Sequence, residues 1–154
     1  MINYDDYLIT FTEVPDEISL CFNITGCPCH CRGCFEPWIQ DNFGAELTTD
    51  VIEPLIQKYY STTCICFMGG DIDHERIMEL IEQCRKKWPQ LKFAMYSGFS
   101  WFDDELASHL DYYKVGPYKE IYGPLNKPTT NQHFYKKENN EWIDITYRFY
   151  DKTV

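Results

Sequence analysis

Basic residues are scarce in this sequence. Lys and Arg together number 14 against 24 Asp and Glu, which gives the 154-residue chain a formal net charge of −10. Proteins that bind nucleic acid or anionic membranes need a surface rich in Lys and Arg to neutralise phosphates. The charge balance therefore argues against nucleic acid and against a membrane as partners, and is compatible with a protein partner that has a basic docking surface.

Long apolar runs and basic leader segments are also lacking. Residues 1–20 read MINYDDYLITFTEVPDEISL, which resembles neither a secretory signal nor a transmembrane helix. We therefore expect a cytoplasmic protein. Gly and Pro number only 8 each, and 44% of the residues are hydrophobic. This composition predicts one globular domain spanning residues 1–154.

Cysteine, in contrast, is abundant. The chain contains 8 cysteines, and in a reducing cytoplasm this number points to metal or redox chemistry rather than to disulfides. Four of them lie in the stretch ITGCPCHCRGC, residues 24–34. The other four fall on expected strands or on an apolar helix face, where small buried side chains are typical.

Hydrophobic periodicity predicts alternating strands and helices. Strands are expected at 18–25, 64–68, 91–96 and 111–115, helices at 51–60, 74–87 and 101–110, and a hairpin in the tail at 133–150. Serial βα units imply a parallel sheet, and a complete eight-unit barrel needs more residues than this chain has. The expected fold is α/β, either an incomplete (β/α) barrel or an open, mainly parallel sheet, with a C-terminal β-hairpin.

The loops that follow the four expected strands carry the residues of interest. They are 26–34, 69–71, 97–98 and 116–117. Because the carboxyl ends of parallel strands meet at one edge of a sheet, we expect these loops to form one ligand site. The run DIDHE at 71–75 could also be drawn as a metal site, but Asp73 as a helix cap explains it more simply.

The cysteine spacing admits several interpretations. Cys27, Cys31 and Cys34 form a C-x3-C-x2-C pattern, and three thiolates on one loop suit a cubane iron–sulfur cluster with its fourth iron open to a chelating ligand. All four thiols, including Cys29, could instead hold zinc, although structural zinc usually joins two separate pairs. Cys31 and Cys34 alone could form a redox dithiol. In the cluster interpretation, the side chain of Cys29 turns away from the iron.

Several fragments together resemble the radical S-adenosylmethionine superfamily, and within it the activating proteins of anaerobic ribonucleotide reductase. The fragments are GCPCHCRGCF at 26–35, PW at 37–38, MGGD at 68–71, YSGFS at 96–100, the segment 111–118 ending in GPY, and TTNQ at 129–132. Their order and spacing cover nearly the whole chain. The resemblance implies a sheet of radical-SAM type.

The resemblance also implies a site. Cys27, Cys31 and Cys34 would hold a [4Fe-4S] cluster, whose free iron takes the amino and carboxylate groups of S-adenosylmethionine. No side chain is assigned a catalytic role, and Asp71 stands where glutamate is commoner in the superfamily. The candidate cofactor-binding residues are Cys29, Phe35, Gly69, Gly70, Asp71, Ser97 and Gly98.

The activity that the resemblance implies is that of an activase. Such a protein cleaves S-adenosylmethionine reductively to place a glycyl radical on the large subunit of anaerobic ribonucleotide reductase. Its electrons come from a low-potential donor such as flavodoxin or ferredoxin. Two alternatives stay open: an activase of another glycyl radical enzyme, and a non-enzymatic zinc or iron–sulfur binding module.

Overall fold

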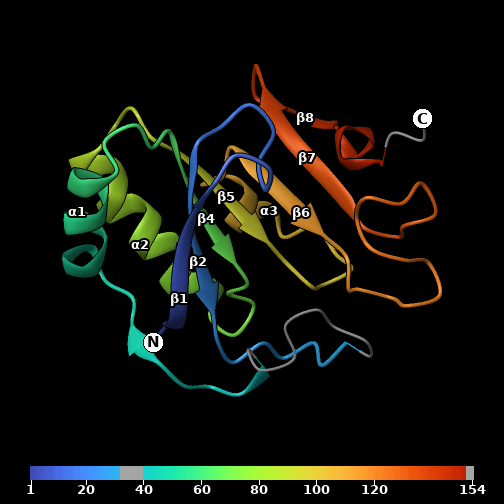
Figure 1. Cartoon of the computed structure of the whole chain (residues 1–154), viewed down its shortest axis with the longest axis horizontal. Coiled ribbons are helices and arrows are strands. Elements are labelled where there is room, and N and C mark those ends of the chain that lie inside the picture. Colours follow the sequence, from blue (N-terminus) through green and yellow to red (C-terminus); the bar gives the residue numbers. More distant parts are fainter. Residues whose placement is uncertain (32–39, 152–154) are drawn as a thin grey trace.

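The computed structural model describes residues 1–31 and 40–151. Its centre is an eight-stranded sheet (Figure 1) with the order β3-β1-β2-β4-β5-β6-β7-β8. The strands are β1 (Asn3–Thr10), β2 (Ser19–Ile24), β3 (Ala45–Glu46), β4 (Cys64–Met68), β5 (Lys92–Tyr96), β6 (Tyr112–Val115), β7 (His133–Glu138) and β8 (Glu141–Asp144). The helices are α1 (Thr49–Lys58), α2 (His74–Lys87) and α3 (Asp104–Ala107), and a 3-10 helix spans Thr146–Phe149.

The middle of the sheet is parallel. β2 pairs with β4, β4 with β5, and β5 with β6, each in parallel register. These are the four strands that the sequence predicts, and their short apolar runs are almost entirely buried, as expected of strands covered on both faces. The loops that follow them leave the sheet at the same edge (Figure 1).

The prediction of an incomplete barrel or a mainly parallel sheet of radical-SAM type is wrong. The sheet is open and mixed, because β1 pairs antiparallel with both β2 and β3, β6 with β7, and β7 with β8. Four of its seven strand pairings are therefore antiparallel. Antiparallel strands flank the parallel core on both sides. The sequence predicts the C-terminal hairpin on one side, but it does not predict strands β1 and β3 on the other.

All three helices pack on one face of the sheet. Their apolar side chains share a core cluster with alternate residues of the parallel strands, among them Phe22, Phe67, Phe93 and Tyr113. Helix α2 begins at the expected place, since the Asp73 side chain accepts a hydrogen bond from the backbone N–H of Arg76. The cap interpretation of the DIDHE run is thus confirmed.

The opposite face of the sheet carries no α-helix among the described elements. The other set of alternate strand residues, including Cys66, Ala94 and Tyr112, forms a second cluster there. It is covered by Val14 from the β1–β2 connection and by Ile145 from the C-terminal segment. Loops and the 3-10 helix cover this face, and a cavity lies above the ends of the parallel strands.

The helix predicted at 101–110 and the hairpin predicted at 133–150 are both shorter in the structure. Helix α3 has four residues and is capped by Asp103, not by Ser100. Phe102, expected inside the helix, instead packs in an aromatic cluster with Tyr113 and Trp142. The hairpin of β7 and β8 is present, but it ends at Asp144, where the chain turns into the 3-10 helix.

Across residues 1–31 and 40–151, the structure contains no helix with the length and apolar character required to span a bilayer.

Candidate cofactor site

A cavity of about 990 Å³ opens on the sheet face without an α-helix, at the carboxyl ends of the parallel strands. The cysteine loop and the loops after β4 and β5 form one side of it. The β1–β2 connection and the C-terminal segment form the other side, where Arg148 and Asp16 make a two-pronged ion pair at 2.9 and 3.1 Å. The candidate residues that line the cavity are Cys27, Cys29, Cys31, Gly69, Asp71, Ser97 and Gly98.

The thiols of the cysteine loop differ in their protonation. A hydrogen bond from the Cys29 thiol, opposed by burial, lowers the pKa of Cys27 to about 6. The same hydrogen bond, together with burial, raises the pKa of Cys29 far above its usual range. Cys27 is therefore a thiolate at neutral pH, which is the form that binds metals. Cys29 is the protonated neighbour.

Cys29 lies on the cavity wall, where its Sγ contacts Asp71 Oδ2 at 3.8 Å. A Cβ atom at Gly98 would come within 2.5 Å of the same sulfur. The glycine at position 98 is thus required for the cysteine loop to approach the end of β5. This contact turns Cys29 toward the two ligand loops.

Cys34 and Phe35 lie outside the described residues, so the third expected iron ligand is not placed. Among residues 1–31 and 40–151, no three His, Cys, Asp or Glu side chains converge closely enough to hold a metal ion. The donor chemistry nevertheless suits iron and sulfide, because two expected ligands, Cys27 and Cys31, line one cavity and one of them is a thiolate.

Gly69 and Gly70 have backbone conformations that other residues rarely adopt. Their φ angles are +112° and +119°, a region in which an L side chain is strained. A Cβ atom at Gly70 would also lie 2.9 Å from the side chain of Ile77 on α2. Of the two, Gly69 lines the cavity, while Gly70 brings the loop close to α2.

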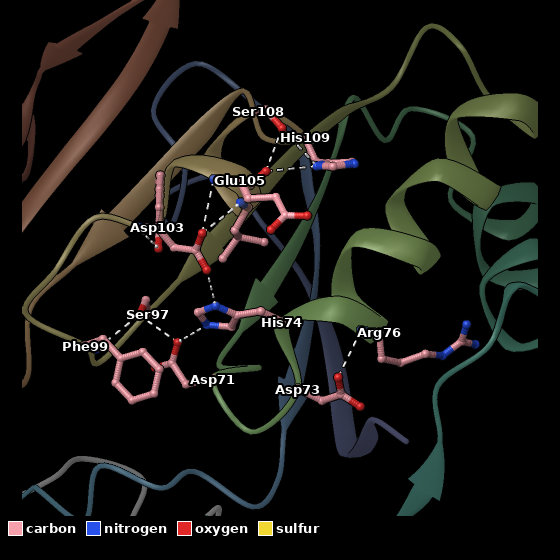
Figure 2. Close-up of polar contacts among 12 residues, drawn as sticks. Asp71, Asp73, His74, Arg76, Ser97, Phe99, Asp103, Glu105, Ser108 and His109 are labelled. Atoms are coloured by element: carbon pink, nitrogen blue, oxygen red, sulfur yellow. Dashed lines mark hydrogen bonds and ion pairs between the residues drawn. The ribbon is translucent and has the colours of Figure 1, made fainter.

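Asp71 is the centre of a buried hydrogen-bond network (Figure 2). Its side chain is only 2% exposed. Oδ1 accepts from the Ser97 hydroxyl at 2.7 Å and from His74 Nε2 at 2.8 Å, and Oδ2 accepts from the Gly98 backbone N–H at 2.7 Å. The carboxylate thus ties the loop after β4 to the loop after β5. Both carboxylate oxygens of Asp71 therefore accept hydrogen bonds from groups of the protein itself.

His74 extends this network to α3 (Figure 2). Its Nδ1 lies 2.7 Å from Asp103 Oδ2, while its Nε2 bonds Asp71. Both ring nitrogens can donate only when the imidazole is protonated. Burial lowers the pKa of His74, but the two carboxylates outweigh burial and raise it above its usual value.

The raised pKa of His74 predicts a pH-dependent stability. A histidine with a raised folded-state pKa stabilises the fold fully below its unfolded pKa of about 6.5, and this contribution is lost as pH rises through the folded-state value. We expect the difference in free energy of unfolding between wild type and H74Q to be larger at pH 6 than at pH 9, measured by urea denaturation. In a D103N background the difference should vary less with pH. A difference that grows with pH would contradict this assignment.

Sequence reasoning missed three residues of this site. They are Met68, Tyr96 and Lys114, which line the cavity and lie at the carboxyl ends of β4, β5 and β6. The available signal was Lys114 itself, a charged residue inside the otherwise apolar strand YYKV. His74 was also missed as a member of the network, because its second partner, Asp103, lies on another element.

An iron–sulfur protein is the class that this cysteine loop and cavity define. The chain matches the family model described as "4Fe-4S single cluster domain" over residues 18–138. The match covers more than half of the chain, so the protein belongs to this family and binds a [4Fe-4S] cluster. No curated protein and no solved structure matches the chain.

Proposed function

We propose that this protein is a radical S-adenosylmethionine activase that generates a glycyl radical on anaerobic ribonucleotide reductase. The observation that carries the proposal is the cavity in which the cysteine loop meets the loops after β4 and β5. An electron-transfer module needs only ligands for its cluster. A cavity of about 990 Å³ beside the cysteines provides space for a bound organic molecule as well.

The proposed cluster ligands are Cys27, Cys31 and Cys34, three thiolates that leave one iron open. When bound, such a cluster would supply the one electron needed for reductive cleavage of S-adenosylmethionine, which is the chemistry that glycyl radical formation on the partner requires. The protein's own residues bind and orient. Asp71 holds the two ligand loops together, and Gly69 lets the backbone approach the ligand.

The proposed partner is the large subunit of the reductase, and the proposed electron donor is a low-potential protein such as flavodoxin or ferredoxin. The cavity opens on the face that no described α-helix covers, which favours entry of a glycine-bearing loop from a second protein. The acidic chain is compatible with a partner that offers a basic docking surface.

The experiment that tests the activity is anaerobic reconstitution with iron and sulfide, reduction, and EPR with and without S-adenosylmethionine. We expect a reduced [4Fe-4S] signal that changes shape when the compound is added, because it binds at the open iron. Incubation with a candidate reductase should then produce a glycyl radical doublet.

Each negative result has its own meaning. A cluster signal that ignores S-adenosylmethionine would overturn the activase proposal and leave an iron–sulfur binding module. A responsive signal without a doublet on the reductase, but with one on another glycyl radical enzyme, would change the partner and keep the chemistry.

A further inference from the structure

Three residues in one row form the floor of the cavity. In the parallel sheet Met68 is opposite Tyr96, and Tyr96 is opposite Lys114. All three lie on the face that carries the second core cluster, since Met68 and Tyr96 pack against it. The next residue in the row, Phe134 on β7, is fully buried. Lys114 is therefore the only charged residue among these four, Met68, Tyr96, Lys114 and Phe134.

Lys114 is a buried cation with neutral partners. The residue is 6% exposed, and its Nζ donates to the Gly116 carbonyl at 2.9 Å and to Gln132 Oε1 at 2.8 Å. An ammonium has three N–H donors. Two of them have these acceptors and the centroid of the Tyr96 ring lies 5.8 Å from Nζ, so one N–H has no oxygen acceptor among the described residues. In the described part of the chain, no carboxylate lies within ion-pair distance of Nζ.

A buried charge without a counter-charge is costly, and few proteins retain one without a use for it. Burial lowers the pKa of Lys114 to about 8, although Asp71 and the thiols of the cysteine loop oppose this shift from a distance. The amine thus remains mostly protonated at neutral pH. It lines the same cavity as the cysteines, where an anionic group of a ligand could approach it.

We propose that Lys114 is an anion-binding position of the cavity, and that its ligand is the carboxylate of the amino-acid portion of the bound cofactor. The inference rests on the proposed function, because it takes S-adenosylmethionine as the molecule in the cavity. A single ammonium with one unused N–H matches a carboxylate monoanion. A phosphate dianion fits poorly, since the Asp71 carboxylate lies in the same cavity and repels a second negative charge.

The test compares two ligands that differ by one carboxylate. Reconstituted full-length protein is held anaerobic and unreduced, so that no turnover occurs, and binding of S-adenosylmethionine and of decarboxylated S-adenosylmethionine is measured by equilibrium dialysis. We expect K114M to weaken binding of S-adenosylmethionine about 10- to 100-fold, the range of one charge-assisted hydrogen bond. Its affinity for the decarboxylated compound should stay within about 3-fold of wild type.

The matched control is K87M, the same substitution at a half-exposed lysine of α2 that pairs with Glu53. It should bind both compounds like wild type. If K114M does not fold, K114Q is measured in the same way, since glutamine keeps a hydrogen-bonding side chain without the charge. Iron content and melting temperature of each variant are recorded beside the affinities.

The outcomes separate this inference from the proposed function. Equal weakening of both compounds by K114M, or no weakening of either, overturns the carboxylate position and leaves the activase proposal intact. Failure of the wild-type protein to bind either compound overturns the proposed function and this inference together. Selective loss of S-adenosylmethionine binding supports both.

Discussion

Protein carrying Cys27→Ala or Cys31→Ala is expected to retain less than one iron per chain after anaerobic reconstitution, against about four in wild type. Each substitution removes one of only three thiolates proposed to hold the cluster. The loss should appear as a missing visible charge-transfer band and a missing reduced EPR signal. Both thiols line the cavity, so each substitution is expected to remove a cluster ligand directly.

Cys29→Ala is the matched control for these variants. It removes a thiol from the same loop and the same cavity wall, but it is not one of the proposed ligands. We expect its iron content and its EPR signal to match wild type. Loss of iron from this variant would contradict the three-thiolate assignment and favour a site that uses all four cysteines of residues 24–34.

Asp71→Ala is expected to lower the free energy of unfolding of the cluster-free protein by about 3 kcal/mol. The substitution leaves three donors without their acceptor: the Ser97 hydroxyl, the Gly98 N–H and His74 Nε2. D71N should cost less, since one amide oxygen can still accept from Ser97 and His74, while its NH2 group faces the Gly98 N–H. Urea denaturation followed by circular dichroism measures both.

The neighbouring carboxylate provides the comparison for Asp71. Asp73 caps α2 through one hydrogen bond to the Arg76 N–H and is one-third exposed, so D73A should cost only about 1 kcal/mol. If D71A and D73A destabilise the protein equally, Asp71 does not tie the two loops together. We also expect D71A, but not D73A, to abolish the EPR change caused by S-adenosylmethionine.

The parallel core could be predicted from the sequence because the signals for each of its strands and helices lie within that element's own residues. Cys64 to Met68 is an apolar run that stops at two glycines, and α2 shows both an apolar face and a cap within its own residues. β1 carries no such signal. It contains two adjacent Asp residues and an irregularity between Tyr4 and Asp6, which hides the alternation of a strand.

The candidate site likewise contains some residues that the sequence predicts and others that it does not. The cysteine loop and Gly69-Gly70 are visible as motifs, because their residue types are unusual at close spacing. The roles of His74 and Lys114 depend on partners far along the chain, Asp103 in one case and Gln132 in the other. Those contacts exist only once the sheet has formed, so neither could be read from the neighbouring residues.

The ion pair of Asp16 with Arg148 joins positions 132 residues apart on one side of the cavity. A ribosome releases the cysteine loop more than a hundred residues before Arg148, so the thiols leave the exit tunnel long before their cavity can close. During synthesis the cysteines are accessible to oxidants and to competing metals. We therefore expect cluster insertion to need a reducing environment until translation ends, or delivery of the cluster to the completed fold.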